Sequence, residues 1–422
     1  MHVTFAPAMP DLDSVGLAVP EILLPAKGVD LARWAVVACD QYTSEPEYWK
    51  AVEKRVGGAP SALRLVLPEV WLGGADEPAR VSAIQRAMKE YLASGVFAPP
   101  RRGFVVVDRS TPHVRSRLGL LVALDLERYD WRPSARALVR ATEATVEERL
   151  PARVRVREGA VLELPHVLVL IDDPGRTVIE PAARSAMARA PLYDTPLEPG
   201  AGRVRGFAVG MEAELEAIAG ALAGLAHPEF LYAVGDGNHS LAAAKLLWER
   251  RKTALGPDAR ERDPARFALA ELVNVHDPGL RFEPIHRVVF GAQPDRLAAE
   301  LAPLAPGGPV RHAVRWSGGG RAGELALSGP RDSLPVAALQ HALDAWLRAH
   351  PDARSDYIHG KDVLRRLCEK PDTTGFVLPA LARDALFPIV ARDGVLPRKA
   401  FSLGEAEEKR FYLEARRLRS EP

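Results

Sequence analysis

Residues 230–252 join a short apolar run to a helical sequence through a turn that contains two glycines. The apolar run ends at Val234, the turn reads GDGNH over 235–239, and a helical pattern begins at Ser240. Glycine adopts positive φ without steric cost, so the backbone can turn tightly and approach a ligand there. The first N–H groups of a helix lack intrahelical acceptors and lie at the positive end of its dipole. This segment therefore predicts a strand–turn–helix element whose turn suits a phosphate or a carboxylate.

Short apolar runs alternate with helical patterns along most of the chain. The runs at 103–108, 117–125 and 164–171 predict strands, and residues 80–94 place apolar side chains at helical spacing. No repeat of fixed period interrupts this alternation. The pattern predicts an α/β or α+β fold, in which a mixed sheet is flanked by helices.

The 422 residues are predicted to form three regions. Residues 1–290 carry the regular alternation and are expected to be the main α/β catalytic region. Residues 291–335 are rich in glycine and proline, which predicts variable loops around a short hairpin. Residues 336–422 are expected to be a helical segment that carries the LPRK loop and packs back on the main region.

Charge and cysteine content exclude several classes of protein. The 56 Lys and Arg residues nearly balance the 55 Asp and Glu residues, whereas a protein that coats nucleic acid needs a basic excess. Cys39 and Cys368 are too few for a disulfide framework, which favours a reducing cytoplasm. The N-terminal residues do not resemble a signal peptide, and the longest apolar runs fall far short of the ~20 residues of a membrane helix. We therefore expect a cytoplasmic protein with neither a membrane nor a nucleic-acid partner.

The GDGNHS turn carries two candidate catalytic residues. Asp236 could accept a substrate proton or bind a metal ion, and His239 could act as an acid or a base or donate to a phosphate. The alternative is an ordinary strand-to-helix turn in which Asp236 is a capping residue. The turn matches neither a Walker loop nor the Rossmann fingerprint, because it lacks GK[ST] and a third glycine. The residues of the turn predicted to bind nucleotide phosphates are Gly235, Gly237, Asn238 and Ser240.

Residues 101–157 form the most basic segment of the chain, with 13 Arg against seven Asp and Glu. Within it, RVRVR at 153–157 alternates strictly, which predicts a strand with three guanidiniums on one face. Arg155 is therefore a candidate phosphate ligand. Glu143, which precedes these arginines, is a candidate general base or ligand of Mg²⁺. The alternative is an exposed, salt-bridged hairpin.

Two further basic pairs are candidates for binding the same anionic substrate. Arg398 and Lys399 are adjacent cations in a loop, and a terminal helix is predicted after them over 405–419. His286 and Arg287 follow an apolar run and are predicted to reach the same pocket. The alternatives are a solvated surface for the first pair and a structural role for the second.

The segment GDGNHSLAAAK at 235–245 resembles the DGHHR-type motif of the family known as domain of unknown function 1015. The resemblance covers most of the chain, roughly 23–417. In this match Asp236, Gly237 and His239 take the places of the motif's Asp, Gly and second His. Asn238 replaces the first His and Ser240 replaces the Arg, which removes a bidentate phosphate donor. Four further segments support the match: LPH at 164–166, EPIHR at 283–287, YIH at 357–359 and LPRK at 396–399.

The DGHHR-type motif is in turn similar to the ParB/sulfiredoxin-like superfamily. Its members bind nucleotide phosphates with such a loop at a helix start, and some of them phosphorylate free serine. The resemblance thus implies a nucleotide-binding element of this type around residues 230–252.

The leading functional hypothesis is phosphoryl transfer from a nucleotide, ATP or ADP with Mg²⁺, to a small hydroxyl metabolite such as serine. Two alternatives stay open at the level of sequence. The first is a nucleotide-binding regulator without turnover. The second is a metabolic hydrolase that acts on an anionic substrate through Asp236 and His239. All three hypotheses expect a small-molecule partner.

Overall fold

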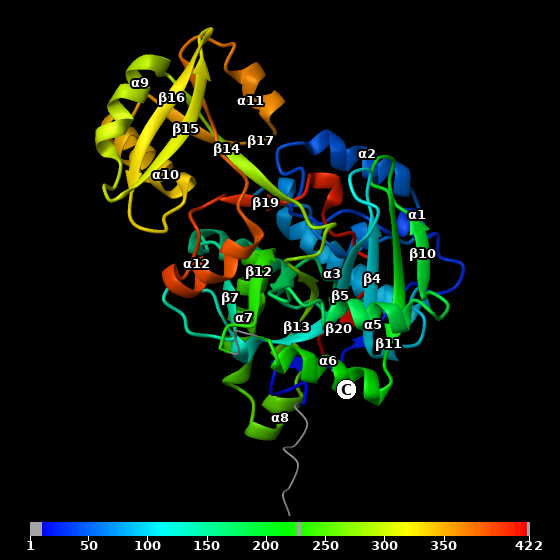
Figure 1. The fold of residues 1–422 in the computed structure, drawn as a ribbon. Helices are drawn as coiled ribbons and strands as arrows, with labels where there is room; N and C mark the ends of the chain where they lie inside the picture. The colour runs from blue at the N-terminus through cyan, green and yellow to red at the C-terminus, as the bar shows by residue number, and fades with distance from the viewer. Residues whose placement is uncertain (1–10, 226–228, 420–422) are drawn as a thin grey trace, which may run out of the picture. The chain divides into compact units, whose positions relative to one another are not determined.

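The computed structural model describes residues 11–225 and 229–419, and the chain divides into two units. Unit 1 comprises Met1–Leu280 and Glu405–Pro422, and unit 2 comprises Arg281–Gly404. Figure 1 draws both units and labels many of their helices and strands. These boundaries differ from the expected divisions at 290 and 335. The strand β14 (Phe282–Phe290) belongs to unit 2 because its pairing partners lie there.

Unit 1 is built on one mixed sheet (Figure 1). The β13–β9, β12–β7 and β7–β6 pairs are parallel and the other pairs are antiparallel, which confirms the predicted mixed sheet. In spatial order the strands are β10 (Tyr193–Pro196), β11 (Arg203–Val209), β4 (Phe104–Ser110), β5 (Arg117–Asp125), β13 (Phe267–Asn274), β9 (Leu168–Ile171), β12 (Tyr232–Asp236), β7 (Val139–Ala141) and β6 (Tyr129–Asp130), with β1 (Leu17–Ala18) paired to β5.

Helices flank this sheet, as the alternation of patterns predicts. They are α1 (Leu31–Trp34), α2 (Pro46–Val56), α3 (Glu77–Ala93), α4 (Leu150–Arg157), α5 (Ile179–Ala186), α6 (Glu212–Ala223), α7 (Asn238–Lys252) and α8 (Pro257–Arg262). Two short pairs complete unit 1: β2 (Glu21–Ile22) with β3 (Arg101–Arg102), and β8 (Leu162–Glu163) with β20 (Arg416–Arg417).

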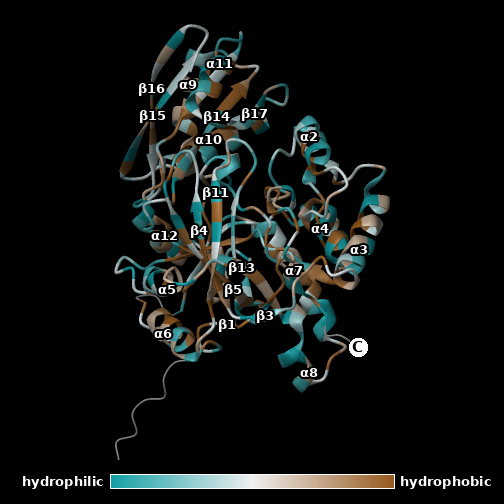
Figure 2. Cartoon of the chain, turned by 90° about the vertical axis from the view of Figure 1, so that its right-hand side faces the viewer, coloured by the Kyte–Doolittle hydropathy of each residue, from teal (hydrophilic) through white to brown (hydrophobic). Residues whose placement is uncertain are grey.

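The strands inside the sheet are buried on both faces and supply two separate cores. In β4, Val105 and Val107 pack with α2 and α3, whereas Phe104 and Val106 pack with α5, α6 and α7. Successive side chains of a strand point to opposite faces, so a sheet covered on both sides needs nearly continuous apolar strands. Figure 2 shows hydrophobic residues gathered on the strands around β5 and β13, and hydrophilic residues on α8.

The last residues of unit 1 form an extended, buried segment rather than a helix. After a short 3₁₀ turn, Phe411 bridges Val37 and Ala415 bridges Leu23 before β20 pairs with β8. The terminal helix predicted over 405–419 is therefore wrong. Pairing with other parts of unit 1 overrides the local helix preference. Five charged residues of this segment are buried: Glu408, Lys409, Arg410, Glu414 and Arg416.

Ion pairs hold this segment inside unit 1. The Arg410 guanidinium, 3% exposed, donates to Glu271 and, at 2.6 Å, to Glu414. The hydroxyl of Tyr193 also donates to Glu414. A buried charge is tolerated only when it is paired and hydrogen-bonded, so these contacts tie the end of the chain to the sheet.

Glu163 makes the stability of unit 1 depend on pH. Burial alone raises the pKa of this carboxyl, but Arg157, Arg416 and the Leu269 N–H outweigh burial and hold the pKa at about 2. Because the folded-state pKa lies below the unfolded-state value, the stabilisation is present above about pH 4.5 and is lost as the pH falls towards 2. We expect the urea midpoint to fall across this window, and to fall less steeply in Glu163→Gln. An equal slope in the two proteins would contradict the assignment.

Unit 2 has its own antiparallel sheet, and four helices pack in the same unit. In spatial order the strands are β16 (Arg321–Gly329), β15 (Val310–Gly318), β18 (Thr373–Val377), β14 and β17 (Arg354–His359), with β19 (Phe401–Leu403) paired to the first residues of β14. The helices are α9 (Pro294–Leu301), α10 (Pro335–Ala349), α11 (Lys361–Leu367) and α12 (Leu386–Asp393).

Two expectations about this part of the chain are corrected. The hairpin expected within 291–335 is present as two nine-residue strands, β15 and β16, but α9 stands where only loops were expected. Exposure alternates along β15, where Val314 and Trp316 are buried and Ala313 and Arg315 are exposed, which is the period of a strand. The helical segment expected over 336–422 contains four strands, β17 to β20, among its helices.

Within the described residues, the helices are all too short or too polar to cross a lipid bilayer.

Candidate functional site

The predicted strand–turn–helix element is present in unit 1. The strand β12 ends at Asp236, Gly237 follows with φ of 80°, and α7 begins at Asn238. A Cβ atom at Gly237 would lie 3.0 Å from the Cγ2 atom and 3.1 Å from the Cα atom of Val167. Gly235 stands where the register between β12 and β9 shifts. The turn closes against Val167 in a conformation that favours glycine at 237.

The N-terminus of α7 opens at this turn without a side-chain cap. The first N–H group bonded inside the helix is that of Leu241, which donates to the Gly237 carbonyl at 3.0 Å. The N–H groups of Asn238, His239 and Ser240 precede it and are the ones that a helix offers to external acceptors. The half-buried Ser240 adds a hydroxyl in the same first turn. Together these groups are suited to an anion.

Asp236 is held in place at the end of β12 by two donors. Its Oδ2 atom accepts from the Lys409 ammonium at 3.0 Å, and its Oδ1 atom accepts from the Gly237 N–H at 3.0 Å. The Lys409 side chain is 8% exposed and that of Asp236 is 24% exposed. A cation and a carboxylate therefore lie together beside the N-terminus of α7.

Glu143 is carried to the same edge of the sheet as Asp236. The strand β7 runs parallel to β12 with Ala141 opposite Val234, and Glu143 and Asp236 each stand two residues beyond that pair. The carboxyl ends of parallel neighbours meet at one edge of a sheet. The Thr142 hydroxyl, next to Glu143, links the end of β7 to β12 by donating to the Val234 carbonyl at 2.6 Å. The two carboxylates predicted from the sequence thus follow adjacent strands.

His239 joins α7 to the segment that follows Glu143. Its Nε2 atom accepts from the Val146 N–H at 3.2 Å. A ring nitrogen that accepts such a bond carries no proton, so this imidazole is neutral with its proton on Nδ1. The bond is made next to the short 3₁₀ turn Glu147–Arg149, which leads into α4. This contact links the first turn of α7 to the segment after Glu143, and the catalytic role of His239 stays a prediction.

A chain of hydrogen bonds borders the turn on the side of Val167. The Tyr412 hydroxyl accepts from the Cys39 N–H at 3.2 Å and lies 2.9 Å from Nδ1 of His166. Burial raises the pKa of Tyr412, so its hydroxyl stays protonated. Burial also raises the pKa of the Cys39 thiol, which makes Cys39 a poor nucleophile. The half-buried His166 is thus linked through Tyr412 to the backbone at Cys39.

The strand predicted over 153–157 is a helix, α4, so its arginines do not share one face. Pro151 fits the first turn of a helix, and α4 packs against α7, which overrides the alternating pattern. Arg155, the predicted phosphate ligand, instead donates to Glu77 of α3 at 2.9 Å. The three arginines of α4 pair with three different carboxylates: Arg153 with Glu69, Arg155 with Glu77, and Arg157 with Glu163.

Arg287, predicted to bind phosphate with His286, is 1% exposed in unit 2 and has a structural role there. Its Nε atom donates to Gln340 at 2.8 Å, and its terminal nitrogens donate to the carbonyls of Ile285, Arg398 and Lys399. The guanidinium therefore holds the LPRK loop in place. Burial and these bonds leave it poorly suited to a ligand.

Arg398 and Lys399 lie in the turn that Arg287 holds, and both side chains are exposed. Lys399 has φ of 53°, a conformation that residues other than glycine adopt infrequently. The role of these two cations in substrate binding stays a prediction. His286 lines a cavity of unit 2, which is described below with that unit.

The residues at the turn do not form a ready-made magnesium site. Among the residues 11–225 and 229–419, no group of three or more His, Cys, Asp or Glu side chains is arranged to hold a metal ion. Both carboxylate oxygens of Asp236 accept hydrogen bonds from Lys409 and Gly237. Mg²⁺ needs oxygen ligands and commonly takes most of them from water and substrate phosphates.

Several residues that border the turn are not predicted from the sequence. For Lys409 the sequence offers one indication of a special role: lysine is rare in this chain, with only ten among the 56 basic residues. His166 stands in the LPH segment that supports the resemblance, although its place in an apolar run suggests a core residue. Tyr412 has no signal of its own. His166 lies there because β9, which follows it, pairs with β12. Lys409 and Tyr412 lie there because the last residues of the chain pair with distant segments, Phe411 with Val37 and Ala415 with Leu23.

A family model described as "Protein of unknown function (DUF1015)" matches residues 23–343, about three quarters of the chain. The match covers the GDGNHS turn and continues into unit 2 as far as α10. None of the curated proteins compared with the sequence matches it.

Solved structures that resemble this chain do so at low identity. A conserved hypothetical protein from Pyrococcus furiosus is 12% identical with a TM-score of 0.35, over 71% of this chain and 95% of that chain. A free serine kinase in complex with AMP is 10% identical with a TM-score of 0.38, over 69% and 90%. C-terminally truncated SbnI from Staphylococcus aureus is 11% identical with a TM-score of 0.35, over 67% and 82%. Likenesses of this degree do not assign an activity.

Proposed function

This chain belongs to the DUF1015 family of proteins of unknown function, and we propose that unit 1 transfers a phosphoryl group from a nucleotide to a small hydroxyl metabolite. One observation carries the proposal. The uncapped N-terminus of α7 lies beside an ion pair of Asp236 and Lys409, at the edge of the sheet to which Glu143 is also carried. This edge combines groups that bind phosphate with a carboxylate that can take a proton.

The phosphates of the nucleotide bind at the start of α7. The N–H groups of its first turn and the Ser240 hydroxyl donate to phosphate oxygens, and the Lys409 ammonium offsets negative charge. Asp236 orients Lys409, since the two side chains are 3.0 Å apart. Phosphoryl transfer depends mainly on such positioning and charge stabilisation.

The acceptor hydroxyl is deprotonated by Glu143. As the acceptor oxygen bonds to the terminal phosphorus, its proton moves to the Glu143 carboxylate and the bond from that phosphorus to the bridging oxygen breaks. The products are the phosphorylated metabolite and a nucleotide that is shorter by one phosphate. His239 acts as a positioning residue, because its contact with Val146 orders the segment after Glu143. Serine is the first acceptor to test.

Magnesium enters this proposal only as a counter-ion that accompanies the nucleotide. The carboxylate of Asp236 is bonded to Lys409 and Gly237, which does not fit a preformed cation site. None of the steps above depends on a metal ion held by the protein.

The test combines nucleotide binding with a product assay. Calorimetry with ATP and ADP, each with Mg²⁺, measures binding, and ³¹P NMR with serine and related hydroxy acids detects a phosphorylated product. We expect Asp236→Asn to weaken nucleotide binding, since it disrupts the Lys409 contact. We expect Glu143→Gln to retain binding and to lower kcat by about a hundredfold, the usual contribution of a general base. Asp194→Asn is the control, because Asp194 lies on the edge strand β10 and pairs with Arg203 of β11.

Each alternative function has its own outcome. Nucleotide binding without any phosphorylated product would favour a regulator. A protein that binds neither ATP nor ADP but turns over an anionic substrate would favour a hydrolase. Either result overturns the proposed phosphoryl transfer.

A further inference from the structure

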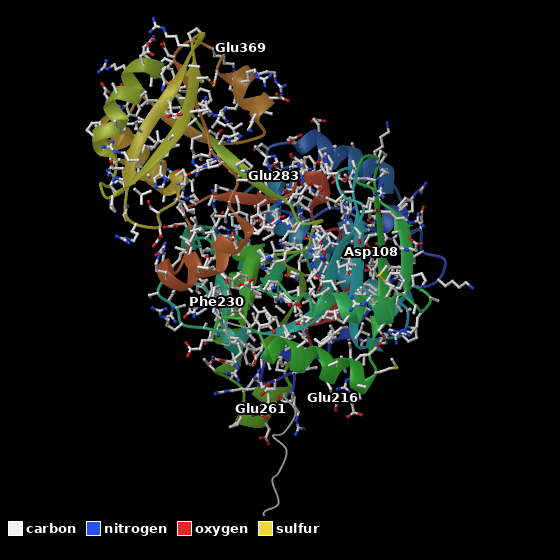
Figure 3. All side chains as sticks on the ribbon, in the orientation of Figure 1. Asp108, Glu216, Phe230, Glu261, Glu283 and Glu369 are labelled. Carbon is white, nitrogen blue, oxygen red and sulfur yellow. The ribbon has the colours of Figure 1, made fainter. Side chains whose placement is uncertain are left out.

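Unit 2 contains a cavity of about 560 Å³ that lies entirely among its own residues. The volume falls in the range of cavities that hold small molecules, about 300–1,000 Å³. The lining comes from the start of β14, from β15, from the end of β18 and the residues after it, and from the start of α11. Figure 3 labels Glu283, which lies at the start of β14 and lines this cavity. Most of the lining is apolar, including Phe282, Val377 and Leu378.

Two cations of this lining form no ion pair among the described residues, and Glu324 of β16 stands opposite one of them, Arg315, in the register of the hairpin. Arg315 lies on the exposed face of β15, and Lys361 is the first residue of α11. Neither side chain forms an ion pair, whereas Glu283, the acid of the lining, is paired with Arg281 at 2.6 Å. The cavity therefore has an excess of positive charge beside an apolar surface. An anionic ligand would balance this charge.

His286 adds a neutral donor at the wall of the cavity. It is 1% exposed, and its Nδ1 atom accepts from the Leu378 N–H at 3.1 Å, so the ring proton is on Nε2. Burial lowers the pKa of His286 to about 4, and the positive charge of Lys361 contributes to this shift. The ring is therefore neutral at pH 7, with a fixed N–H donor. Hydrogen bonds from cations such as Arg315 and Lys361 to carboxylate or phosphate oxygens are stronger than those between neutral groups, and His286 lines the same cavity.

We propose that this cavity binds a small organic anion, a carboxylate or a phosphate monoester with an apolar portion. Arg315 and Lys361 bind the anionic group together with the Nε2–H group of His286, and the side chains around Phe282 and Leu378 contact the apolar portion. The site lies in unit 2 and does not depend on phosphoryl transfer in unit 1.

Binding of defined probes to the full chain tests the proposal. Phenyl phosphate and phenylacetate carry both halves of the expected ligand, inorganic phosphate lacks the apolar half, and 2-phenylethanol lacks the charge. We expect calorimetry to detect at least one of the two organic anions, and to find each partial probe at least tenfold weaker. The comparison of phenyl phosphate with phenylacetate shows which anionic group is preferred.

Variants of the lining locate the site. Arg315→Ala and Lys361→Ala are each expected to lower the affinity for the organic anion by about tenfold or more. A hydrogen bond to a charged group usually contributes this much to binding. His286→Asn keeps an acceptor for Leu378 and removes the Nε2–H donor, so a smaller loss is expected. The matched control is Arg311→Ala, since Arg311 lies on the same exposed face of β15 and is outside the lining.

Two results would overturn this site. One is the absence of binding for both organic anions, and the other is an affinity that is unchanged in both Arg315→Ala and Lys361→Ala. Asp236→Asn separates this proposal from the function proposed for unit 1. It should leave binding of the organic anion unchanged, and a loss in Asp236→Asn alone would assign the bound anion to unit 1 instead.

Discussion

Replacement of Arg410 by methionine is expected to lower the free energy of unfolding by about 3–5 kcal/mol. The Arg410 guanidinium is buried between Glu271 and Glu414, and both carboxylates are 1% exposed. Methionine keeps most of the side-chain volume but removes the charge. The buried Glu414 then loses its cation, and the buried Glu271 keeps the Arg117 guanidinium at 3.9 Å. The cost exceeds the contribution of a typical surface pair. Urea unfolding of the variant and of the wild type measures the difference.

The double variant Arg410→Met/Glu271→Gln tests whether unpaired charge is the cause. Removal of one of the two carboxylates should recover part of the lost stability, so the two changes should not be additive. Arg132→Met is the control, since Arg132 pairs with Asp130 at the surface, and it should leave the urea midpoint unchanged. If Arg410→Met were as stable as the wild type, the ion pairs would not hold the terminal segment in unit 1.

Gly237→Ala is expected to destabilise unit 1 by about 2–4 kcal/mol and to abolish nucleotide binding at the turn. A left-handed conformation costs a residue with a Cβ atom about 1–2 kcal/mol, and overpacking typically adds about 1–3 kcal/mol. Here the new Cβ atom would meet the Cα atom of Val167 at 3.1 Å. Val167 cannot move away freely, because its carbonyl accepts from the Glu271 N–H in the sheet. The turn would have to open, which displaces Asp236 from Lys409.

Gly256→Ala provides the matched control for this substitution. Gly256 has φ of −69°, and a Cβ atom there would have no neighbour within 4 Å. Its stability should change by less than about 1 kcal/mol. Thermal unfolding gives the stability, and calorimetry with ATP and ADP gives the binding. Wild-type stability in Gly237→Ala would show that the turn accepts a side chain and is not held against Val167.

The turn and its two neighbouring elements could be predicted from the sequence because local signals agree there. The run FLYAV favours a buried strand, the glycines permit the turn, and the alanine-rich segment that follows favours a helix. The structure confirms this order, with β12 ending at Asp236 and α7 beginning at Asn238. The link between Asp236 and Glu143 was also within reach of prediction. It requires only that their two strands be parallel neighbours.

Some elements are stabilised by contacts with residues far away in the sequence, and these elements could not be predicted from local patterns. The alternating run RVRVR at 153–157 has the period of a strand, but packing against α7 and three separate ion pairs stabilise a helix. The terminal residues 405–419 have a composition typical of a solvated helix. They form an extended segment because Arg410 and Arg416 find carboxylates inside unit 1. The periodicity of a short segment contains no information about which distant residues its side chains will contact.

By itself, the sequence determined the mixed α/β class, the family and the turn that opens α7, since these depend on neighbouring residues. Only the tertiary structure decided which charged groups stand beside that turn. Lys409 reaches Asp236 across 173 positions, and Tyr412 reaches His166 across 246. These contacts exist because the last residues of the chain return to unit 1 and are buried there. Burial makes an unpaired charge costly, so the position of each charged side chain is set by the partner that the fold brings to it.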